Sequence, residues 1–287
     1  MSDRIILKTS LGKHDYVRPL KDGAITSERF QFDFVEYDPL PKAFRAMVRG
    51  ADIDVGEIAI TTHLLALEFK KPLSGIPIQL WRRLHHSNLV CLTGSDIRSP
   101  KDLEGKKVGV RAYSQTTGVW IRGILKTQYG VDLDKITWVT IEDAHVAEYQ
   151  DPPNAVRNVS GKSLREMLFS GELAAIMGER EVDPSNVRTV VPNAAAEAEE
   201  WSRRTGLFPV NHILAVRTEL LLQYPWLRDE LMRVLDESRI RSGAKGVAAM
   251  PYSLDPNRHA MQTLCDFAAD QKLTSKVFQL DEVFPAG

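Results

Sequence analysis

The feature that most constrains this chain is the stretch 105–130, GKKVGVRAYSQTTGVWIRGILKTQYG. A short β-branched run around Val108 and Val110 leads into a turn, residues 112–118, that is rich in hydroxyl and amide side chains. Apolar residues then recur at helical spacing over 119–129. A helix that begins in such a turn directs unpaired backbone N–H groups and the positive end of its dipole at whatever lies before it. The stretch therefore predicts a binding site for a small anion, such as a carboxylate, at the edge of an α/β sheet; we call this site the anion seat.

Composition narrows the function classes. The chain has 287 residues, 43% of them hydrophobic, and a formal net charge of −1. These values argue against disorder and against bulk nucleic-acid binding, and the scattered Lys and Arg form no polybasic membrane patch. The apolar run at 5–7 is too short for a signal-peptide core, and no stretch is long enough to span a bilayer. We expect a cytoplasmic protein with no nucleic-acid or membrane partner; homo-oligomerisation stays open.

Strands and helices alternate along the chain, which predicts an α/β sandwich with mostly parallel sheets. Cys91 and Cys265 have no metal-ligand spacing, and a reduced pair is favoured over a disulfide. A loop is expected at 148–162 and a surface helix at 194–204. Strands are expected at 5–9, 32–37, 54–60, 76–81, 89–93, 136–141, 173–177 and 213–217, and further helices at 42–49, 63–69, 100–105, 164–170, 226–242 and 257–271.

Candidate ligand contacts follow the first and the third strand of this pattern. His14-Asp15-Tyr16 comes after the first strand, and of these three we favour Tyr16 and Asp15. The alternative is a plain turn with a capping Asp. Thr61 and Thr62 end the third expected strand and begin a helix, so they are candidates both for an N-cap and for ligand donors.

The densest polar cluster is Arg82-Arg83-Leu84-His85-His86-Ser87. Adjacent residues of an extended segment face opposite sides, so His85 and His86 cannot readily share a metal ion. No helical His pair or carboxylate set accompanies them, and no metal site is expected. We interpret His86 as an acid or base, Arg82 as an anchor for a substrate carboxylate, and His85 and Ser87 as further contacts. The alternative is a solvated basic face.

The remaining candidates lie at the helix start and after the later strands. Tyr113, Gln115, Thr116 and Thr117 form the predicted anion seat, while Trp120 is expected in the core and Arg122 at the surface or packed at an edge. Arg180 follows the strand at 173–177, where a ligand contact and a surface role are equally plausible. His212, with Asn211 before it, precedes an apolar strand and is a candidate for the site, although a lone histidine there is often structural. His63, His145 and His259 are expected to be structural or exposed.

Taken together, these segments resemble the 4,5-dihydroxyphthalate decarboxylase family, whose fold is that of type 2 periplasmic binding proteins. This chain departs from the family at three places, because the family usually has Tyr-Gln-Met-Thr at 113–116, Arg at His85 and Met at Asn211. The matching pieces are Asp15-Tyr16, Arg18, Asp22-Gly23, residues 44–62, Arg82, His86-Ser87, 102–110, 119–125, 129–131, 205–209, His212, Pro225-Trp226, Pro251-Tyr252 and 256–258.

The resemblance implies an α/β fold of two lobes with a ligand cleft between them. Lobe I would hold 1–88 and 206–287 and lobe II 89–205, with the chain crossing near Leu89 and Thr205. It further implies cofactor-independent decarboxylation of a hydroxylated aromatic (di)carboxylic acid such as 4,5-dihydroxyphthalate. The aromatic ring serves as its own electron sink. His86 and His212 are then the acid–base candidates and Tyr16 a third.

Other function classes stay open. A non-catalytic solute-binding protein for an aromatic carboxylate would use the same clamp, and so would another lyase such as a dehydratase of the futalosine menaquinone route. A regulatory ligand-binding domain is a further alternative, although no helix-turn-helix segment accompanies it.

Overall fold

The computed structural model describes residues 4–50, 52–178 and 185–285, and the chain divides into two compact units. Unit 1 comprises Met1–Arg83, Val210–Cys265 and Lys276–Gly287, and unit 2 comprises Leu84–Pro209 and Asp266–Ser275. The expected assignment of 84–88, 206–209 and 266–275 to the first lobe is therefore wrong. Phe267 packs on Trp120 and Gln271 bonds Arg122, both on a helix of unit 2. A ligand position between the units stays a prediction.

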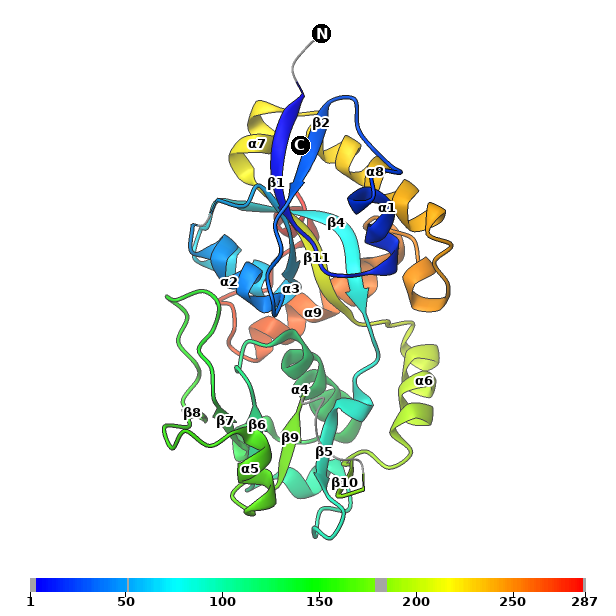
Figure 1. Cartoon of the computed structure of the whole chain (residues 1–287). Helices are drawn as coiled ribbons and strands as arrows, with labels where there is room; N and C mark the ends of the chain where they lie inside the picture. Colours follow the sequence, from blue (N-terminus) through cyan, green and yellow to red (C-terminus); the bar gives the residue numbers. More distant parts are fainter. Residues whose placement is uncertain (1–3, 51, 179–184, 286–287) are drawn as a thin grey trace. The chain divides into compact units, whose positions relative to one another are not determined.

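Unit 1 is built on a five-stranded mixed sheet with the order β2-β1-β3-β11-β4 (Figure 1). β1 runs parallel to β2 and β3, whereas β11 returns from late in the sequence and pairs antiparallel with both β3 and β4. The bounds are β1 (Ile5–Ser10), β2 (Phe30–Phe34), β3 (Val55–Ala59), β4 (Leu73–Arg82) and β11 (Val210–Arg217).

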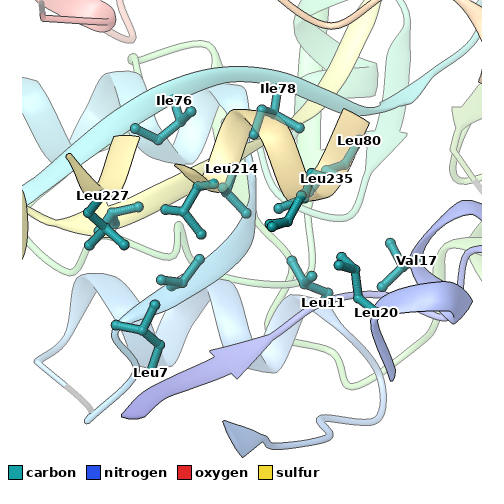
Figure 2. Packing of buried hydrophobic residues seen from close by; sticks show 14 of the residues in the cluster. Leu7, Leu11, Val17, Leu20, Ile76, Ile78, Leu80, Leu214, Leu227 and Leu235 are labelled. Atoms are coloured by element: carbon teal, nitrogen blue, oxygen red, sulfur yellow. The ribbon is translucent and has the colours of Figure 1, made fainter. Parts of the chain in front are cut away.

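The core of unit 1 lies between this sheet and helix α8 (Leu227–Arg241). Successive strand residues face opposite sides, so Ile76, Ile78 and Leu80 of β4 present one apolar face. Leu227, Leu231, Val234 and Leu235 recur on one side of α8 and pack against it, as Figure 2 shows for part of the cluster. Each such side chain contributes about 1.5–3 kcal/mol when fully buried. Other helices of unit 1 are α1 (Arg18–Lys21), α2 (Pro41–Val48), α3 (Ile60–Glu68), α7 (Thr218–Gln223) and α10 (Leu280–Val283).

Unit 2 has a six-stranded sheet with the order β10-β5-β9-β6-β7-β8. The pairs from β9 to β8 are parallel, and β5 and β10 are antiparallel to their neighbours. The strands are β5 (Leu89–Leu92), β6 (Lys107–Val110), β7 (Thr137–Thr140), β8 (Ala155–Arg157), β9 (Ala175–Met177) and β10 (Val187–Thr189), and the helices are α4 (Thr116–Tyr129), α5 (Leu164–Phe169) and α6 (Ala194–Thr205); α9 (Arg258–Asp270) ends in this unit.

The α/β class and most elements agree with the sequence analysis. Among the elements that it does not predict are α1, β10, α7 and α10. Both sheets are mixed, because β11, β5 and β10 pair antiparallel. α4 begins at Thr116, inside the predicted turn, and β8 lies inside the predicted loop 148–162. Within the described ranges, no helix has the length and apolar character needed to cross a membrane.

Candidate functional site

A buried carboxylate, Glu57, lies at the centre of a polar cluster in unit 1. Its side chain is 0% exposed and sits in the middle of β3, whose residues are all buried. His212 Nδ1 lies 2.6 Å from Glu57 Oε1, and His14 Nε2 lies 3.1 Å from Oε1 and 2.9 Å from Oε2. The backbone N–H of Gly12 donates to Oε2 at 2.9 Å. We call Gly12, His14, Glu57 and His212 the Glu57 cluster.

Sheet register brings the members of the Glu57 cluster together. β1 pairs in parallel with β3 through Ser10 and Gly56, so the chain that follows β1 passes beside Glu57. β11 pairs antiparallel with β3, with His212 opposite Ala59. The cluster therefore lies beside the middle of β3 and just beyond the carboxyl end of β1, close to the edge at which α/β sheets commonly bind ligands.

The charge state of the cluster follows from burial and hydrogen bonding. Burial opposes ionisation of Glu57, but the hydrogen bonds from His14 and His212 outweigh it and hold the pKa of the carboxyl well below its usual range. Burial lowers the pKa of His212 even though Glu57 acts in the opposite direction. At neutral pH an ionised Glu57 thus accepts the Nδ1–H of a neutral His212. The lone pair of that imidazole is then on Nε2, as a general base requires.

Aromatic packing fixes the ring of His212. Phe44 meets it edge-on with centroids 5.0 Å apart, and Trp81 lies against it at 4.7 Å. The Arg83 guanidinium stacks on Trp81 at 4.8 Å and also helps to lower the pKa of His212. The imidazole is therefore held in one orientation by two rings and one carboxylate.

Tyr16 and Asp15, which the sequence analysis favoured over His14, form hydrogen bonds with residues other than Glu57. Tyr16 stacks on His14 at 4.9 Å, and its hydroxyl donates to the Leu80 carbonyl. Burial raises the pKa of the Tyr16 phenol, which makes it a poor proton donor at neutral pH. The Asp15 side chain is 89% exposed and pairs with Arg18 at 2.9 Å. The geometry thus gives Tyr16 a packing role and Asp15 a surface one; their roles toward a substrate stay predictions.

Arg82 and the two threonines occupy buried positions near strand ends. Arg82 ends β4 and donates to Gln79 Oε1 at 3.2 Å and to the Pro251 carbonyl at 3.0 Å, and burial lowers its pKa to about 10. These contacts hold the guanidinium in the protein interior. Thr61 and Thr62 are buried in the first turn of α3, whose N-cap is Ala59. Neither threonine is therefore the N-cap.

In unit 2 the predicted anion seat is the start of α4. Gln115 is the N-cap, and Thr116 and Thr117 are buried in the first turn. Tyr113 is buried too, and its hydroxyl donates to the Gln271 carbonyl at 3.3 Å. Its role and those of Gln115, Thr116 and Thr117 in ligand binding stay predictions.

Arg122 is fully buried, so the expectation of a surface position is wrong. Its guanidinium lies over the Tyr113 ring at 3.9 Å and donates to Gln271 Oε1 at 2.7 Å and to the Tyr113 carbonyl at 2.6 Å. Trp120 is buried in the core as expected.

His86 belongs to unit 2. Its Nε2 donates to Gln128 Oε1 at 2.9 Å, its ring meets Trp201 edge-on, and burial lowers its pKa. Pairing of His86 with His212 as acid and base stays a prediction. Of the other candidates, His85 and Asn211 are buried and Ser87 is exposed. Arg180 lies outside the described residues. In the ranges that the structure covers, no three His, Cys, Asp or Glu side chains are placed to hold a metal ion.

The sequence analysis does not single out Gly12 or Glu57, and it favours Tyr16 and Asp15 over His14. The available signal was an acidic residue in the middle of an otherwise apolar strand, because a fully buried carboxylate needs partners.

Comparisons with known proteins agree with the resemblance drawn from the sequence. A family model described as NMT1/THI5 like matches residues 57–152. The 4,5-dihydroxyphthalate decarboxylase of Comamonas testosteroni is 29% identical over 288 aligned residues, which cover 91% of this chain and 84% of that protein. The enzyme of the same name from Pseudomonas putida is 28% identical over 186 residues, covering 62% and 72%. The resemblance to this family is thereby confirmed.

Solved structures identify the fold. The periplasmic aliphatic sulphonate binding protein SsuA from Escherichia coli matches 98% of this chain and 92% of its own, with a TM-score of 0.58 at 14% identity. The desulfurization enzyme DszB matches 98% and 96%, with a TM-score of 0.59 at 14% identity. The chain therefore has the type 2 periplasmic-binding-protein-like fold, which is shared here by a binding protein and an enzyme.

Proposed function

We propose that this chain, which resembles the 4,5-dihydroxyphthalate decarboxylases over most of its length, is a carboxy-lyase that needs no cofactor. Its substrate is a hydroxylated aromatic (di)carboxylic acid such as 4,5-dihydroxyphthalate. The names of the two curated relatives support a decarboxylase role. The likeness to SsuA supports the alternative, a protein that binds such an acid and leaves it unchanged.

The single observation that carries the proposal is the pair of Glu57 and His212. The 2.6 Å hydrogen bond from His212 Nδ1 orients the imidazole and leaves Nε2 as the basic nitrogen. A carboxylate behind a histidine stabilises the imidazolium that forms when the ring takes a proton. A base positioned in this way accelerates proton transfer by about 10²–10⁴-fold.

The reaction needs such a base because the ring carbon that bears the carboxylate must become electron-rich enough to be protonated before the C–C bond breaks. His212 Nε2 takes the proton of a hydroxyl para to the carboxylate, and the electron density of the phenolate reaches the carbon that bears the carboxylate. Protonation of that carbon interrupts aromaticity, and loss of CO2 restores it. His212 then returns its proton to the phenolate oxygen.

The test is incubation of the protein with a panel of hydroxylated aromatic mono- and dicarboxylates, with CO2 and the product measured by mass. We expect one or more para-hydroxylated acids to lose one carboxylate. In D2O the product should carry one deuterium at the carbon that lost it. Tight binding of these acids with no CO2 release from any of them would overturn the enzyme proposal in favour of a solute-binding protein.

A further inference from the structure

The Glu57 cluster contains a second imidazole, that of His14. The mechanism above assigns no residue to the protonation of the ring carbon, and His14 is a candidate for it. His14 Nε2 lies within hydrogen-bond distance of both oxygens of Glu57, at 2.9 and 3.1 Å. A carboxylate can only accept, so Nε2 carries a hydrogen. The nitrogen that gains or loses a proton in His14 is therefore Nδ1.

Charge balance and burial indicate which imidazole acts as the acid and which as the base. One Glu57 carboxylate offsets one imidazolium, so only one of the two imidazoles is charged before the substrate loses its phenolic proton. His212 contacts one oxygen of Glu57, is packed by Phe44 and Trp81, and has a side chain that is 14% exposed. His14 contacts both oxygens and its side chain is 21% exposed. His14 is thus the better placed of the two imidazoles to exchange a proton with water while it stays bonded to Glu57.

We propose that His14 is the general acid of the decarboxylation, an assignment that rests on the proposed function. The Nδ1–H of the His14 imidazolium gives its proton to the ring carbon that bears the departing carboxylate. The N–H electron pair stays on Nδ1, and a C–H bond forms with the electron pair supplied by the phenolate ring. The C–C bond to the carboxylate then breaks, CO2 leaves, and its electron pair restores the aromatic ring.

Each histidine returns to its starting protonation state after one turnover. His212 takes the phenolic proton and returns it to oxygen, so it is unchanged at the end. His14 loses one proton to carbon and regains one from water. The reaction thus consumes one solvent proton for each CO2. Glu57 stays ionised throughout, and while both imidazoles are protonated the substrate phenolate supplies the second negative charge.

The experiment compares His14→Gln with the wild type on the best acid of the panel. Gln keeps an N–H donor for Glu57 but has no transferable proton at neutral pH. We expect kcat to fall by about 10²–10⁴-fold while KM changes little. The absorbance of bound phenolate should persist, because His212 still acts as base. Exchange of the product's ring hydrogen with D2O, the reverse of the acid step, should be lost. His259→Gln, at an exposed position, is the matched control.

The outcomes separate this assignment from the proposed function. A folded H14Q protein that releases CO2 at the wild-type rate would overturn the acid role. Loss of the phenolate absorbance together with activity would also overturn it, because His14 would then only position Glu57. If H14Q does not fold, His14→Asn takes its place under the same readouts. A wild-type protein that releases no CO2 from any acid would instead overturn the proposed function.

Discussion

His212 Nδ1 lies 2.6 Å from Glu57 Oε1, and this bond connects β11 to its neighbour β3 within one sheet. The two residues are 155 positions apart in the chain, so the contact exists only because a late strand is inserted between two early ones. The bond sets which imidazole nitrogen is free to act as a base. It thereby turns a buried charge, which is costly in isolation, into an orienting group.

Glu57→Gln tests this orienting role. The amide is nearly isosteric but can donate to His212 Nδ1, which would move the imidazole hydrogen to Nε2 and abolish the base. We expect kcat for CO2 release to fall by about 10²–10⁴-fold with little change in KM. Glu36→Gln, an exposed acid, is the control. Unchanged kcat in E57Q would remove the carboxylate from the mechanism.

Tyr16→Phe distinguishes a packing phenol from a proton donor. The variant loses the hydrogen bond to the Leu80 carbonyl, so the free energy of unfolding should fall by about 1 kcal/mol. Activity at saturating substrate should stay near the wild-type value, because burial raises the pKa of this phenol. Steady-state kinetics and urea unfolding measure the two effects. An inactive but stable Y16F would make the phenol the acid in place of His14.

His63 should make the protein lose stability as the pH falls. It is buried in α3, its ring lies 3.1 Å from the Val283 carbonyl, and burial lowers its pKa from 6.5 to about 4. Between these values the unfolded chain binds the proton and the folded chain does not. The contribution is therefore intact above about pH 6.5 and declines toward pH 4, by on the order of 3 kcal/mol in total.

Urea unfolding at a series of pH values measures this effect. His63→Gln should flatten the slope of the unfolding free energy between pH 6.5 and about 4, whatever its effect at neutral pH. His259→Gln is exposed and serves as the control for losing one histidine. Equal slopes in the wild type and H63Q would show that His63 titrates normally in the folded state.

Gly123→Ala tests the docking of residues 266–275 on unit 2. A Cβ at Gly123 would lie 2.1 Å from Phe267 Cδ2, so either the ring or the backbone must shift. We expect a loss of about 1–3 kcal/mol in the free energy of unfolding, partly recovered in G123A/F267L. Gly94→Ala, where no atom lies within 4 Å of the added carbon, is the control. A neutral G123A would mean that this segment does not pack on α4 in solution.

The sequence identified the regular elements because their periodicity is local. The helical spacing after Gly118 and the alternation in Val108 and Val110 each depend on residues within one or two turns. Strand order is not local. Nothing in the β11 segment shows that it pairs antiparallel between β3 and β4, so these two pairings were not predicted.

The dependence on strand pairing also explains which residues of the site were not predicted. His212 was singled out, but its partner Glu57 was not, because their contact requires the register of β11. His14 lies 43 residues from Glu57 and depends on the pairing of β1 with β3. Arg122 was expected to be exposed or packed at an interlobe edge, because an arginine on a helix is usually at least partly exposed. Its burial depends on a hydrogen bond to Gln271, 149 residues later in the chain. No local sequence pattern indicates that Gln271 packs on α4.

The most direct test of the central claim is the rate of CO2 release by His212→Gln at saturating substrate, compared with the wild type and with His63→Gln. Gln preserves a side-chain amide at this position but cannot take and return a proton at neutral pH. The account predicts that H212Q binds the aromatic acid, forms no phenolate and releases CO2 about 10²–10⁴-fold more slowly, whereas His63→Gln turns over like the wild type. A folded H212Q that releases CO2 at the wild-type rate would contradict it.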